Sequence, residues 1–243
     1  MKYSVCIATY NGVAFLEEQL DSILSEFDSS EDKYEIIIVD DFSSDNTVDL
    51  IKSYNNKNIK IFLNDRNMGH VKSFERSLKE STGDYIFLSD QDDIWVPGRV
   101  KLMVDELSKS NCEILFSGFS YIDKSGVQST LNGNAYAIPP LNSSFTNILS
   151  IILGKADYWG CTALLTKSSL DSILPFDQSV EAHDHWIATV GIVEGKVHSI
   201  SEATLLHRIH GKNVTSTKNR TLLKKLKTRF IMLKCLFYVV LRS

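Results

Sequence analysis

Two carboxylates one residue apart, Asp90 and Asp92, directly follow a short apolar run at residues 85–88 (YIFL). Carboxylates at positions i and i+2, on a chain that leaves the edge of a sheet, can share one hard divalent cation. Mg²⁺ or Mn²⁺ prefers oxygen ligands and usually keeps coordination positions for substrate phosphates. A cation held there would neutralise a diphosphate and stabilise it as a leaving group. The alternative interpretation is an ordinary acidic surface turn.

Two further polar clusters follow apolar runs earlier in the chain. Thr9, Tyr10 and Asn11 come after the first run, and Asp40 and Asp41 come after the second. Asp40 could accept the ring N–H of a uracil or thymine, and Tyr10 could lie against the face of the base. The alternatives are plain packing for Tyr10 and a helix cap for the acidic pair, because the Ser-Ser-Asp-Asn sequence that follows is cap-forming.

Two groups of polar residues occur in the last third of the chain. Arg208 and His210 fall on one side of an extended segment and could contact a diphosphate or its metal, since Arg suits charge-assisted contacts to phosphate. A solvated loop is the alternative. His183, Asp184 and His185 could suggest a transition-metal site. However, side chains at i and i+2 diverge on a helix and the trio alternates on a strand, so it is poorly arranged for one ion.

The elements that must position these groups alternate in the first half of the chain. Strands are predicted at residues 3–8, 34–39, 59–63 and 85–88, and helices at 15–24, 47–54 and 71–81. This order predicts an α/β fold with a mostly parallel central sheet and helices on both faces. Ligands of such sheets bind beyond the carboxyl ends of the strands, where the first three polar clusters would converge.

The second half of the chain is less regular. Helices are predicted at residues 100–108 and 186–193, and strands at 114–121 and 161–166. Residues 123–147 are polar and rich in turn-forming residues, so they are expected to form a mobile loop over the site.

Charge is distributed unevenly along the 243 residues. Thirty acids and 16 Lys or Arg lie in residues 1–202, whereas ten Lys or Arg and no acid follow Glu202. Within residues 222–241, apolar side chains recur at spacings of three or four, at Leu222, Leu226, Phe230, Leu233 and Phe237. A basic amphipathic helix of this kind is typical of a segment that rests on an anionic membrane surface. The alternatives are packing on its own domain or on a partner in an oligomer.

Composition limits the class of protein. With 43% hydrophobic and 23% charged residues, the chain is predicted to be globular. The four cysteines form no CxxC pair, which favours reduced thiols in a cytoplasmic protein. No signal peptide is visible, and no apolar run reaches the ~18–20 residues that span a membrane. We therefore expect a cytoplasmic location, at the inner face of the cytoplasmic membrane, and no nucleic-acid partner.

The ordered set of motifs resembles the family 2 glycosyltransferases, enzymes with the Rossmann-like GT-A fold. The matching segments are residues 5–12 (VCIATYNG), 39–45 (VDDFSSD), 67–69 (NMG) and 83–95 (GDYIFLSDQDDIW). The last segment resembles the bacterial subgroup that builds surface polysaccharides such as O-antigen and capsule, which includes many proteins assigned as rhamnosyltransferases. The resemblance covers most of residues 1–215, and the set as a whole is specific.

The resemblance implies an inverting, metal-dependent transfer of a sugar from a UDP- or dTDP-linked donor to a saccharide, such as a lipid-linked oligosaccharide. It implies a GT-A domain at residues 1–217, with a nucleotide-sugar-binding half at 1–98 and an acceptor-binding half at 99–217, followed by a basic amphipathic helical tail at 218–243. Asp184 matches the carboxylate that takes the proton from the acceptor hydroxyl, although the usual Glu-Asp form is His-Asp here. A helix N-terminus would favour its ionised form.

The resemblance also indicates which other residues meet the substrates. Donor contacts are expected from Thr9, Tyr10, Asn11, Asp40, Asp41, Asn67, Lys72, Asp90, Gln91, Arg208 and His210, and the ligands of Mn²⁺ or Mg²⁺ from Asp90 and Asp92. Acceptor contacts are expected from Asp93, Trp95, Trp159 and His183. A Trp can lie against the apolar face of a sugar, but a core Trp is the alternative for Trp159.

Two other functions would use the same residues and stay open. One is a metal-dependent phosphohydrolase that cleaves sugar nucleotides with water, and the other is a non-catalytic sugar-nucleotide-binding protein. A dinucleotide-dependent oxidoreductase would show G-x-G-x-x-G after the first strand, and a P-loop NTPase would show G-x-x-x-x-G-K. The chain has Thr-Tyr-Asn-Gly there, which excludes both classes.

Overall fold

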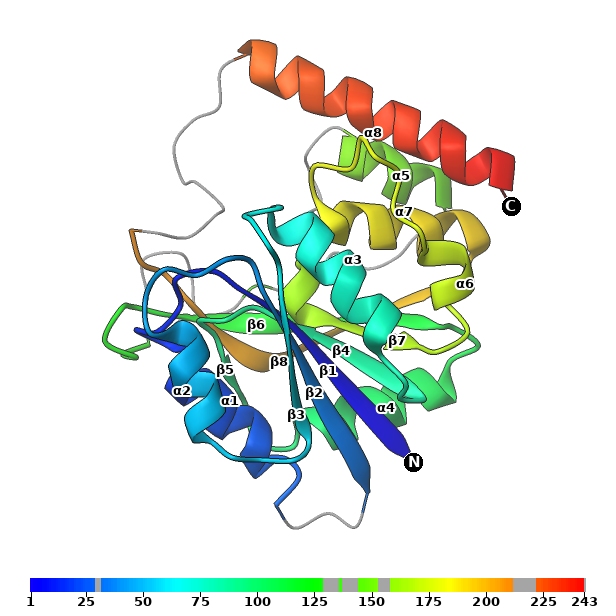
Figure 1. Ribbon diagram of the computed structural model, residues 1–243. Helices are drawn as coiled ribbons and strands as arrows, with labels where there is room; N and C mark the ends of the chain where they lie inside the picture. Colours follow the sequence, from blue (N-terminus) through cyan, green and yellow to red (C-terminus); the bar gives the residue numbers. More distant parts are fainter. Residues whose placement is uncertain (29–31, 129–135, 137–143, 153–157, 212–221, 243) are drawn as a thin grey trace.

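The computed structural model describes residues 1–28, 32–128, 136, 144–152, 158–211 and 222–242 (Figure 1). The strands are β1 Lys2–Thr9, β2 Lys33–Asp40, β3 Ile59–Leu63, β4 Tyr85–Ser89, β5 Ile94–Trp95, β6 Ile114–Ile122, β7 Ala163–Thr166 and β8 Val197–Arg208. The helices are α1 Leu16–Ser25, α2 Thr47–Ser53, α3 His70–Glu80, α4 Arg99–Lys109, α5 Ser144–Ile152, α6 Leu170–Ile173, α7 His183–Glu194 and α8 Leu222–Arg242, with a 3₁₀ turn at Gly160–Thr162.

The strands form one twisted sheet in the order β3-β2-β1-β4-β7-β6-β8-β5. Strands β1 to β4 are parallel to one another, and β8 is parallel to β6. Strands β7 and β5 run antiparallel to their neighbours. The predicted α/β fold, with a mostly parallel sheet and helices on both faces, is confirmed. One sheet therefore joins the segments predicted to bind the donor and the acceptor.

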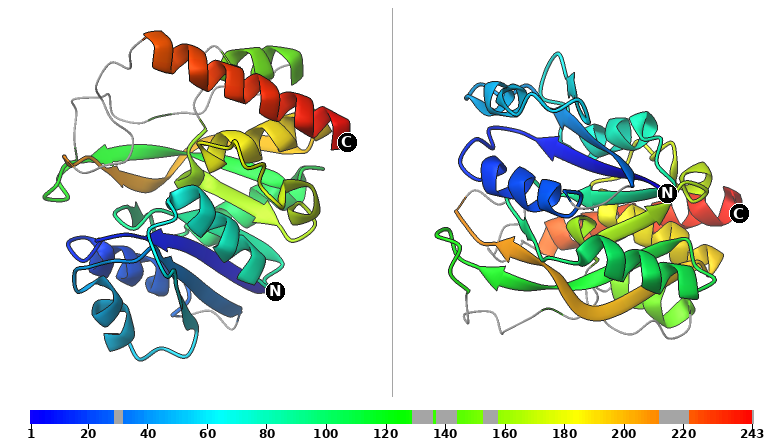
Figure 2. Two further views of the ribbon diagram at one scale, coloured as in Figure 1. Left: turned by 45° about the horizontal axis from the view of Figure 1, so that its top comes forward. Right: turned by 90° about the horizontal axis from the view of Figure 1, so that it is seen from below.

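Side chains of the central strands alternate between two cores, one on each face of the sheet. In β1, Val5 and Ile7 belong to one core and Cys6 to the other, as the two-residue period of a strand requires. Helices α1, α2 and α4 contribute to the first core (Figure 1). Helices α3, α5, α6 and α7 cover the other face, and α8 lies along the outside of this layer (Figure 2).

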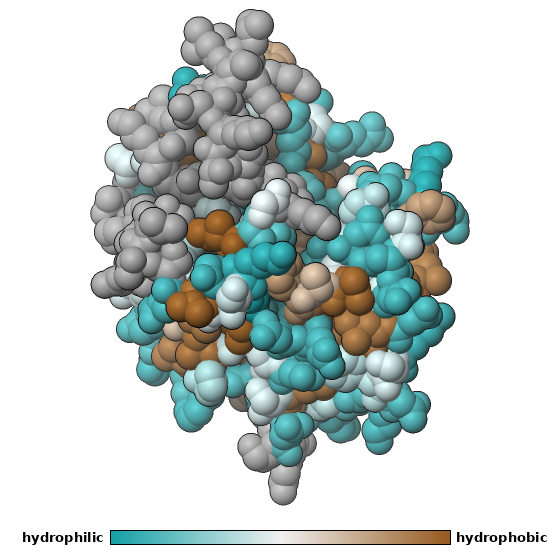
Figure 3. Space-filling model, turned by 90° about the vertical axis from the view of Figure 1, so that its left-hand side faces the viewer, coloured by the Kyte–Doolittle hydropathy of each residue, from teal (hydrophilic) through white to brown (hydrophobic). Residues whose placement is uncertain are grey.

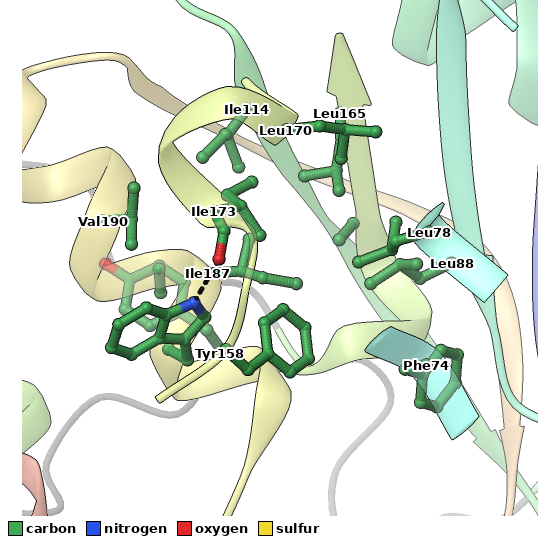
Figure 4. Packing of buried hydrophobic residues seen from close by; sticks show 14 of the residues in the cluster. Phe74, Leu78, Leu88, Ile114, Tyr158, Leu165, Leu170, Ile173, Ile187 and Val190 are labelled. Atoms are coloured by element: carbon green, nitrogen blue, oxygen red, sulfur yellow. Dashed lines mark hydrogen bonds between the residues drawn. The ribbon is translucent and has the colours of Figure 1, made fainter. Parts of the chain in front are cut away.

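Helix α7 is buried on nearly all sides because it lies between the sheet and α8. Its Trp186, Ile187 and Val190 pack with side chains of β6, β7 and α6 (Figure 4). The indole N–H of Trp186 donates to the carbonyl oxygen of Ile173 at 2.9 Å, so the one polar atom of this ring is satisfied in the core. This packing fixes the position of the first turn of α7, which carries Asp184.

The second half departs from the sequence prediction in several places. Strand β8, strand β5 and helix α6 were not predicted. Residues 144–147, predicted as part of a loop, form the start of α5 instead. Much of the remaining predicted loop, residues 129–135 and 137–143, lies outside the described residues. The strand predicted at 161–166 begins as a 3₁₀ turn and becomes β7 only at Ala163.

Helix α8 packs on α7 through a different face from the predicted apolar stripe. Cys235 and Val239 are buried against the domain, whereas Phe230, Leu233 and Phe237 are exposed. The side chains of Leu222 and Leu226 lie outside the described residues. Among the helices searched in the described part of the chain, no segment is long and apolar enough to cross a membrane.

Candidate active site

The loops that follow β1, β2 and β4 meet at one edge of the sheet, on the left of Figure 1. Thr9 at the end of β1 is paired in register with Asp40 at the end of β2, and its hydroxyl donates to Oδ1 of Asp40 at 2.9 Å. The backbone N–H of Tyr10 donates to Oε1 of Gln91 at 2.9 Å, and Nε2 of Gln91 donates back to the carbonyl oxygen of Tyr10 at 3.2 Å. The three polar clusters expected to converge do lie together, because parallel strands end at the same edge.

Asp41 uses both carboxylate oxygens to hold the loop before α3. It accepts hydrogen bonds from the backbone N–H groups of Met68 and Gly69, both at 2.7 Å, and from Nδ2 of Asn64 at 2.8 Å. Asp41 was expected to contact the donor directly. In the structure its buried carboxylate positions the 67–69 loop, and the contact with the donor stays a prediction.

Asp40 is also buried. Ser43 donates hydrogen bonds to its carboxylate and does not cap α2. Oδ2 of Asp40 accepts the backbone N–H of Ser43 at 2.8 Å, and Oδ1 accepts the Ser43 hydroxyl at 2.6 Å. The first turn of α2 is held instead by Asp45, whose Oδ1 accepts the N–H of Thr47 at 3.1 Å. Of the predicted capping residues, Asn46 is the N-cap without a side-chain bond, Asp45 accepts the first N–H of the helix, and Ser43 orients the carboxylate that was predicted to face the base.

Asp90, Asp92 and Asp93 form a compact acidic cluster, with one carboxylate oxygen of each within 4.8 Å of the others. Burial raises the pKa of Asp90 and Asp92, and the charge of Asp93 raises both further. Ionised carboxylates crowded in this way repel one another, and a cation would relieve that repulsion. The oxygen donor set and its charge fit a hard divalent cation such as Mg²⁺ or Mn²⁺.

His210 lies directly against this cluster. Its Nε2 is 2.7 Å from Oδ2 of Asp92, and its ring packs on Phe15 with the ring centres 4.7 Å apart. His210 was expected to meet the diphosphate or the metal, and the structure brings it to the predicted metal ligand. An imidazole nitrogen could add a ligand to the carboxylate oxygens.

Arg208 is buried beside the loop that carries the acidic cluster. Only 1% of the residue is exposed, and its guanidinium stands 5.0 Å from the centre of the Phe15 ring. Nε donates to the carbonyl oxygen of Asp92 at 3.0 Å, and the guanidinium also pairs with Glu18. The predicted contact with the diphosphate is therefore not supported. Arg208 instead ties the end of β8 to the loop that carries the carboxylates.

Asp93 is buried beside the cluster and pairs with His207, which the sequence analysis missed. Nδ1 of His207 lies 2.9 Å from Oδ1 of Asp93, and the backbone N–H of Arg208 donates to the same oxygen at 3.1 Å. Burial opposes the charge on each side chain, but their mutual attraction outweighs it, so the pKa of Asp93 is lowered and that of His207 is raised. Asp93 therefore helps to position the loop, and its predicted contact with an acceptor is not supported by its burial.

Trp95 is likewise a packing residue. It is 2% exposed, its indole N–H donates to the hydroxyl of Ser89 at 3.0 Å, and the guanidinium of Arg99 lies 4.7 Å from its ring centre. The short strand β5 places this side chain in the core, so the predicted acceptor contact of Trp95 is not supported by its burial. Trp159 is half-buried instead, with its ring centre 5.0 Å from that of His207.

Asp184 lies in the first turn of α7, and its negative charge acts on the acidic cluster. Its Oδ1 accepts the backbone N–H of His185 at 2.7 Å. Its negative charge is one of the groups that raise the pKa of Asp90, after burial and the neighbouring carboxylates Asp93 and Asp92. Asp184 therefore contributes to the electrostatic environment of Asp90, and its role as the base stays a prediction.

His183, next to the predicted base, is a neutral aromatic group. Burial lowers its pKa to about 4, against the opposing effect of Asp184. Its ring stacks on Phe74 at 4.1 Å, and neither ring nitrogen has a hydrogen-bond partner within the described residues. Among those residues, His183, Asp184 and His185 form no three-ligand group, which disfavours a transition-metal site here.

The two remaining predicted donor contacts lie near the start of α3. Nζ of Lys72 pairs with Glu75 at 2.8 Å and is partly exposed. Oδ1 of Asn67 accepts the N–H of Gly69 at 3.2 Å. The edge also exposes Tyr10, Phe42 and Met68, which the sequence analysis did not single out as a group. Figure 3 looks onto this side of the molecule and shows hydrophobic patches among hydrophilic side chains.

Known proteins resemble the chain in sequence and fold. A family profile described as "Glycosyl transferase family 2" matches residues 4–174. An uncharacterized glycosyltransferase of Nostoc sp. is 28% identical over 224 residues, covering 88% of this chain and 66% of that protein. The poly(ribitol-phosphate) beta-N-acetylglucosaminyltransferase TarS of Staphylococcus aureus is 29% identical over 153 residues, covering 62% of this chain and 26% of that protein.

The fold has a close match among solved structures. The crystal structure of S. aureus TarS 1-349 in complex with UDP-GlcNAc matches with a TM-score of 0.72 at 20% identity, and the match covers 96% of this chain and 66% of that one. This likeness shows the GT-A fold. The chain spans no more than 66% of the length of the Nostoc protein, of TarS or of the crystallised TarS 1-349.

Proposed function

The chain belongs to glycosyl transferase family 2, and on that premise we propose that it transfers a sugar from a nucleoside diphosphate sugar to a saccharide hydroxyl, with inversion at the anomeric carbon. The observation that carries the proposal is the acidic cluster of Asp90, Asp92 and Asp93, at the strand edge where Thr9, Asp40 and Gln91 also lie. Its carboxylate oxygens suit a divalent cation that would neutralise a leaving diphosphate. Asp184, in the first turn of α7, is the proposed general base.

Asp90 and Asp92 would hold the divalent cation, Mn²⁺ or Mg²⁺, with His210 as a further ligand. The cation would neutralise the diphosphate as it leaves. Asp40, held by Thr9 and Ser43, would accept the ring N–H of a pyrimidine base. Support for a UDP-linked donor comes from the crystallised TarS, which was solved with UDP and with UDP-GlcNAc. A dTDP-linked donor is the other candidate.

Asp184 would act as the base on the acceptor side. It lies in the first turn of α7, and the N-terminus of a helix carries a partial positive charge. The bond from the backbone N–H of His185 fixes one oxygen. The other oxygen would take the proton of the acceptor hydroxyl as that hydroxyl attacks the anomeric carbon. The half-buried Trp159 would lie against the acceptor sugar, and the neutral His183 would shape the site beneath it.

A panel of nucleoside diphosphates tests the proposal. UDP, dTDP, GDP and CDP would each be added with and without Mn²⁺, and the melting temperature of the protein measured. A ligand at about 100 times its Kd stabilises the native state by about 2.7 kcal/mol, or roughly 5–10 °C for a chain of this size. We expect such a shift for UDP or dTDP, and only with the metal. The absence of any shift with all four nucleotides would contradict the proposal.

We further propose that the acceptor is a lipid-linked oligosaccharide of cell-surface polysaccharide synthesis, and that α8 holds the enzyme on the inner face of the cytoplasmic membrane. Phe230, Leu233 and Phe237 form an exposed apolar row, while the opposite face of α8 is fixed to the domain. The ten basic residues after Glu202, with no acid among them, suit an anionic lipid surface. TarS, whose name gives a poly(ribitol-phosphate) acceptor, supports a polymer acceptor of this kind.

Changing the exposed row to serine is expected to release the protein from vesicles. The variant F230S/L233S/F237S should sediment at least about tenfold less with anionic phosphatidylglycerol vesicles, because each fully buried Phe or Leu contributes about 1.5–3 kcal/mol. Its melting temperature should be unchanged, since these side chains face solvent. Val127→Ser, at another exposed apolar residue, is the control. Equal sedimentation of variant and wild type would remove the membrane proposal, and a monomerised variant would indicate a protein partner instead.

A further inference from the structure

Two exposed aromatic residues follow neighbouring strands at the edge of the sheet where β1 and β2 end. Tyr10 is 47% exposed and Phe42 is 59% exposed. The residues that follow them are joined, because the backbone N–H of Asn11 donates to the hydroxyl of Ser43 at 2.8 Å. We propose that Phe42 is a nucleobase-binding residue, which forms with Tyr10 the aromatic surface on which the base of the donor stacks. This inference rests on the proposed function.

The backbone of Phe42 is the first reason. Its φ is +68°, in the left-handed region that bulky residues rarely adopt and that glycine adopts freely. Glycine would therefore be the least strained residue at this position. Strained residues of this kind persist where the surrounding structure determines them strongly, and they concentrate at ligand-binding sites.

Hydrogen bonds on both sides of Phe42 hold its backbone in this conformation. Before it, the backbone N–H of Asp41 donates to the carbonyl oxygen of Thr9 at 2.8 Å. After it, the N–H of Ser43 donates to Oδ2 of Asp40 at 2.8 Å. The N–H of Ser44 donates to Oδ1 of Asn11 at 2.8 Å. The left-handed turn is thus pinned on both sides, and the side chain is directed into solvent by the backbone rather than by loose packing.

The exposure of the ring is the second reason. Phe42 has no polar atom, so an exposed position gains nothing from water, whereas the flat face of a base would cover it. Stacking on an aromatic side chain suits every base, because each base presents a π face. The exposed ring of Phe42 can therefore stack on a planar, apolar surface, and the nucleobase is the part of the donor that has one.

The position along the sheet identifies the base as the part of the donor that reaches Phe42. The acidic cluster follows β4, and Phe42 follows β2, with β1 between them. Two strand spacings are roughly 10 Å, which is a suitable separation for the two ends of a nucleoside diphosphate. Asp40, the predicted acceptor for the ring N–H of the base, lies two residues before Phe42. A diphosphate on the acidic cluster would therefore direct its base to this place.

Glycine at position 42 separates the role of the ring from that of the backbone. In Phe42→Gly the strain is removed, so the melting temperature should stay the same or rise. With saturating Mn²⁺, the Kd for UDP and dTDP should rise about tenfold, because stacking on one aromatic side chain contributes to binding on that scale. The Kd for inorganic pyrophosphate with Mn²⁺ should be unchanged, since pyrophosphate has no base. Phe42→Trp should keep wild-type affinity for both nucleotides.

Asn55→Gly is the matched control, because Asn55 also has a positive φ, +45°, and follows α2 outside the site. Asn55→Gly should leave the Kd for the nucleotides and the Kd for pyrophosphate unchanged. If Phe42→Gly binds UDP and dTDP within twofold of wild type, the inference is overturned while the proposed function stands. An equal loss for pyrophosphate would also overturn it, because the residue would then act on the whole site. If the wild type itself binds no nucleotide, the proposed function fails and the inference fails with it.

Discussion

Replacing Asp184 with asparagine is expected to lower the rate of sugar transfer by about 10²–10⁴-fold while leaving donor affinity unchanged. The substitution keeps the size of the side chain and an oxygen that can accept the N–H of His185. It removes the ability to take a proton. The carboxylates proposed to bind the metal are all retained in this variant, so metal-dependent donor binding should persist.

The rate of nucleoside diphosphate release from the matching sugar donor, with and without a saccharide acceptor, measures this effect. Donor affinity is measured separately by the metal-dependent thermal shift. Asp171→Asn is the matched control, since Asp171 is an exposed aspartate in the first turn of α6. If Asp184→Asn retains more than about a third of the wild-type turnover, Asp184 is not the base.

The same pair of assays separates a transferase from a phosphohydrolase. A transferase should release nucleoside diphosphate faster when a suitable saccharide is present, and loss of Asp184 should remove that acceleration. A hydrolase would use water equally well with or without the saccharide. A non-catalytic binding protein would show the thermal shift and no turnover by the wild type.

The first half of the fold could be predicted closely from the sequence because its signals are local. Each parallel strand there is dominated by apolar residues, and each helix has its own apolar face. The predicted strand at residues 59–63 coincides with β3, and the others differ by one or two residues. The alternation of strands and helices then placed the polar clusters at one edge, which the structure shows.

Strand β8 could not be predicted in the same way because its signal is not local. Its 12 residues mix polar and apolar types, and it is held by pairing with β6 and β5. The pairing with β6 is irregular around Gly118, where a Cβ atom would lie 2.5 Å from the carbonyl oxygen of Ser201. The burial of Arg208 and the pairing of Asp93 with His207 depend on β8, so both were missed with it.

Helix α8 shows another limit of sequence patterns. The spacing of Phe230, Leu233 and Phe237 predicted an apolar face, but Ile231, Cys235 and Val239 form a second one. Periodicity cannot choose between two apolar faces of the same helix. In the structure, packing against the core that includes α7 buries the second face, and Nζ of Lys234 lies 3.8 Å from Oδ1 of Asp177.

Replacing Asp92 with asparagine is expected to abolish the metal-dependent part of nucleotide binding. An amide group is a much poorer ligand for a hard cation than a carboxylate, and the substitution removes one negative charge from the cluster. Since loss of an outer-shell group alone typically costs 10–100-fold in metal affinity, loss of this ligand should cost at least about 100-fold. His210, 2.7 Å from Asp92, would also lose its charged partner.

The stability of the metal-free protein should change in the opposite direction. Burial and the charge of Asp93 raise the pKa of Asp92, so the folded state disfavours its ionised form. A carboxyl group whose pKa is higher in the folded state lowers stability once the pH exceeds its unfolded value near 4. Asp92→Asn removes this cost. At pH 7 without metal, its melting temperature should therefore equal or exceed that of the wild type.

Melting temperatures of wild type and Asp92→Asn, with Mn²⁺ and UDP added separately and together, test both effects at once. The wild type should gain stability only when both are present, and the variant should gain none at the same concentrations. A lower melting temperature without metal would mean that the bond to His210 outweighs the repulsion within the cluster. A full Mn²⁺-dependent shift in the variant would show that the metal is held elsewhere, and that the carboxylates at the end of β4 serve only to fix the loop.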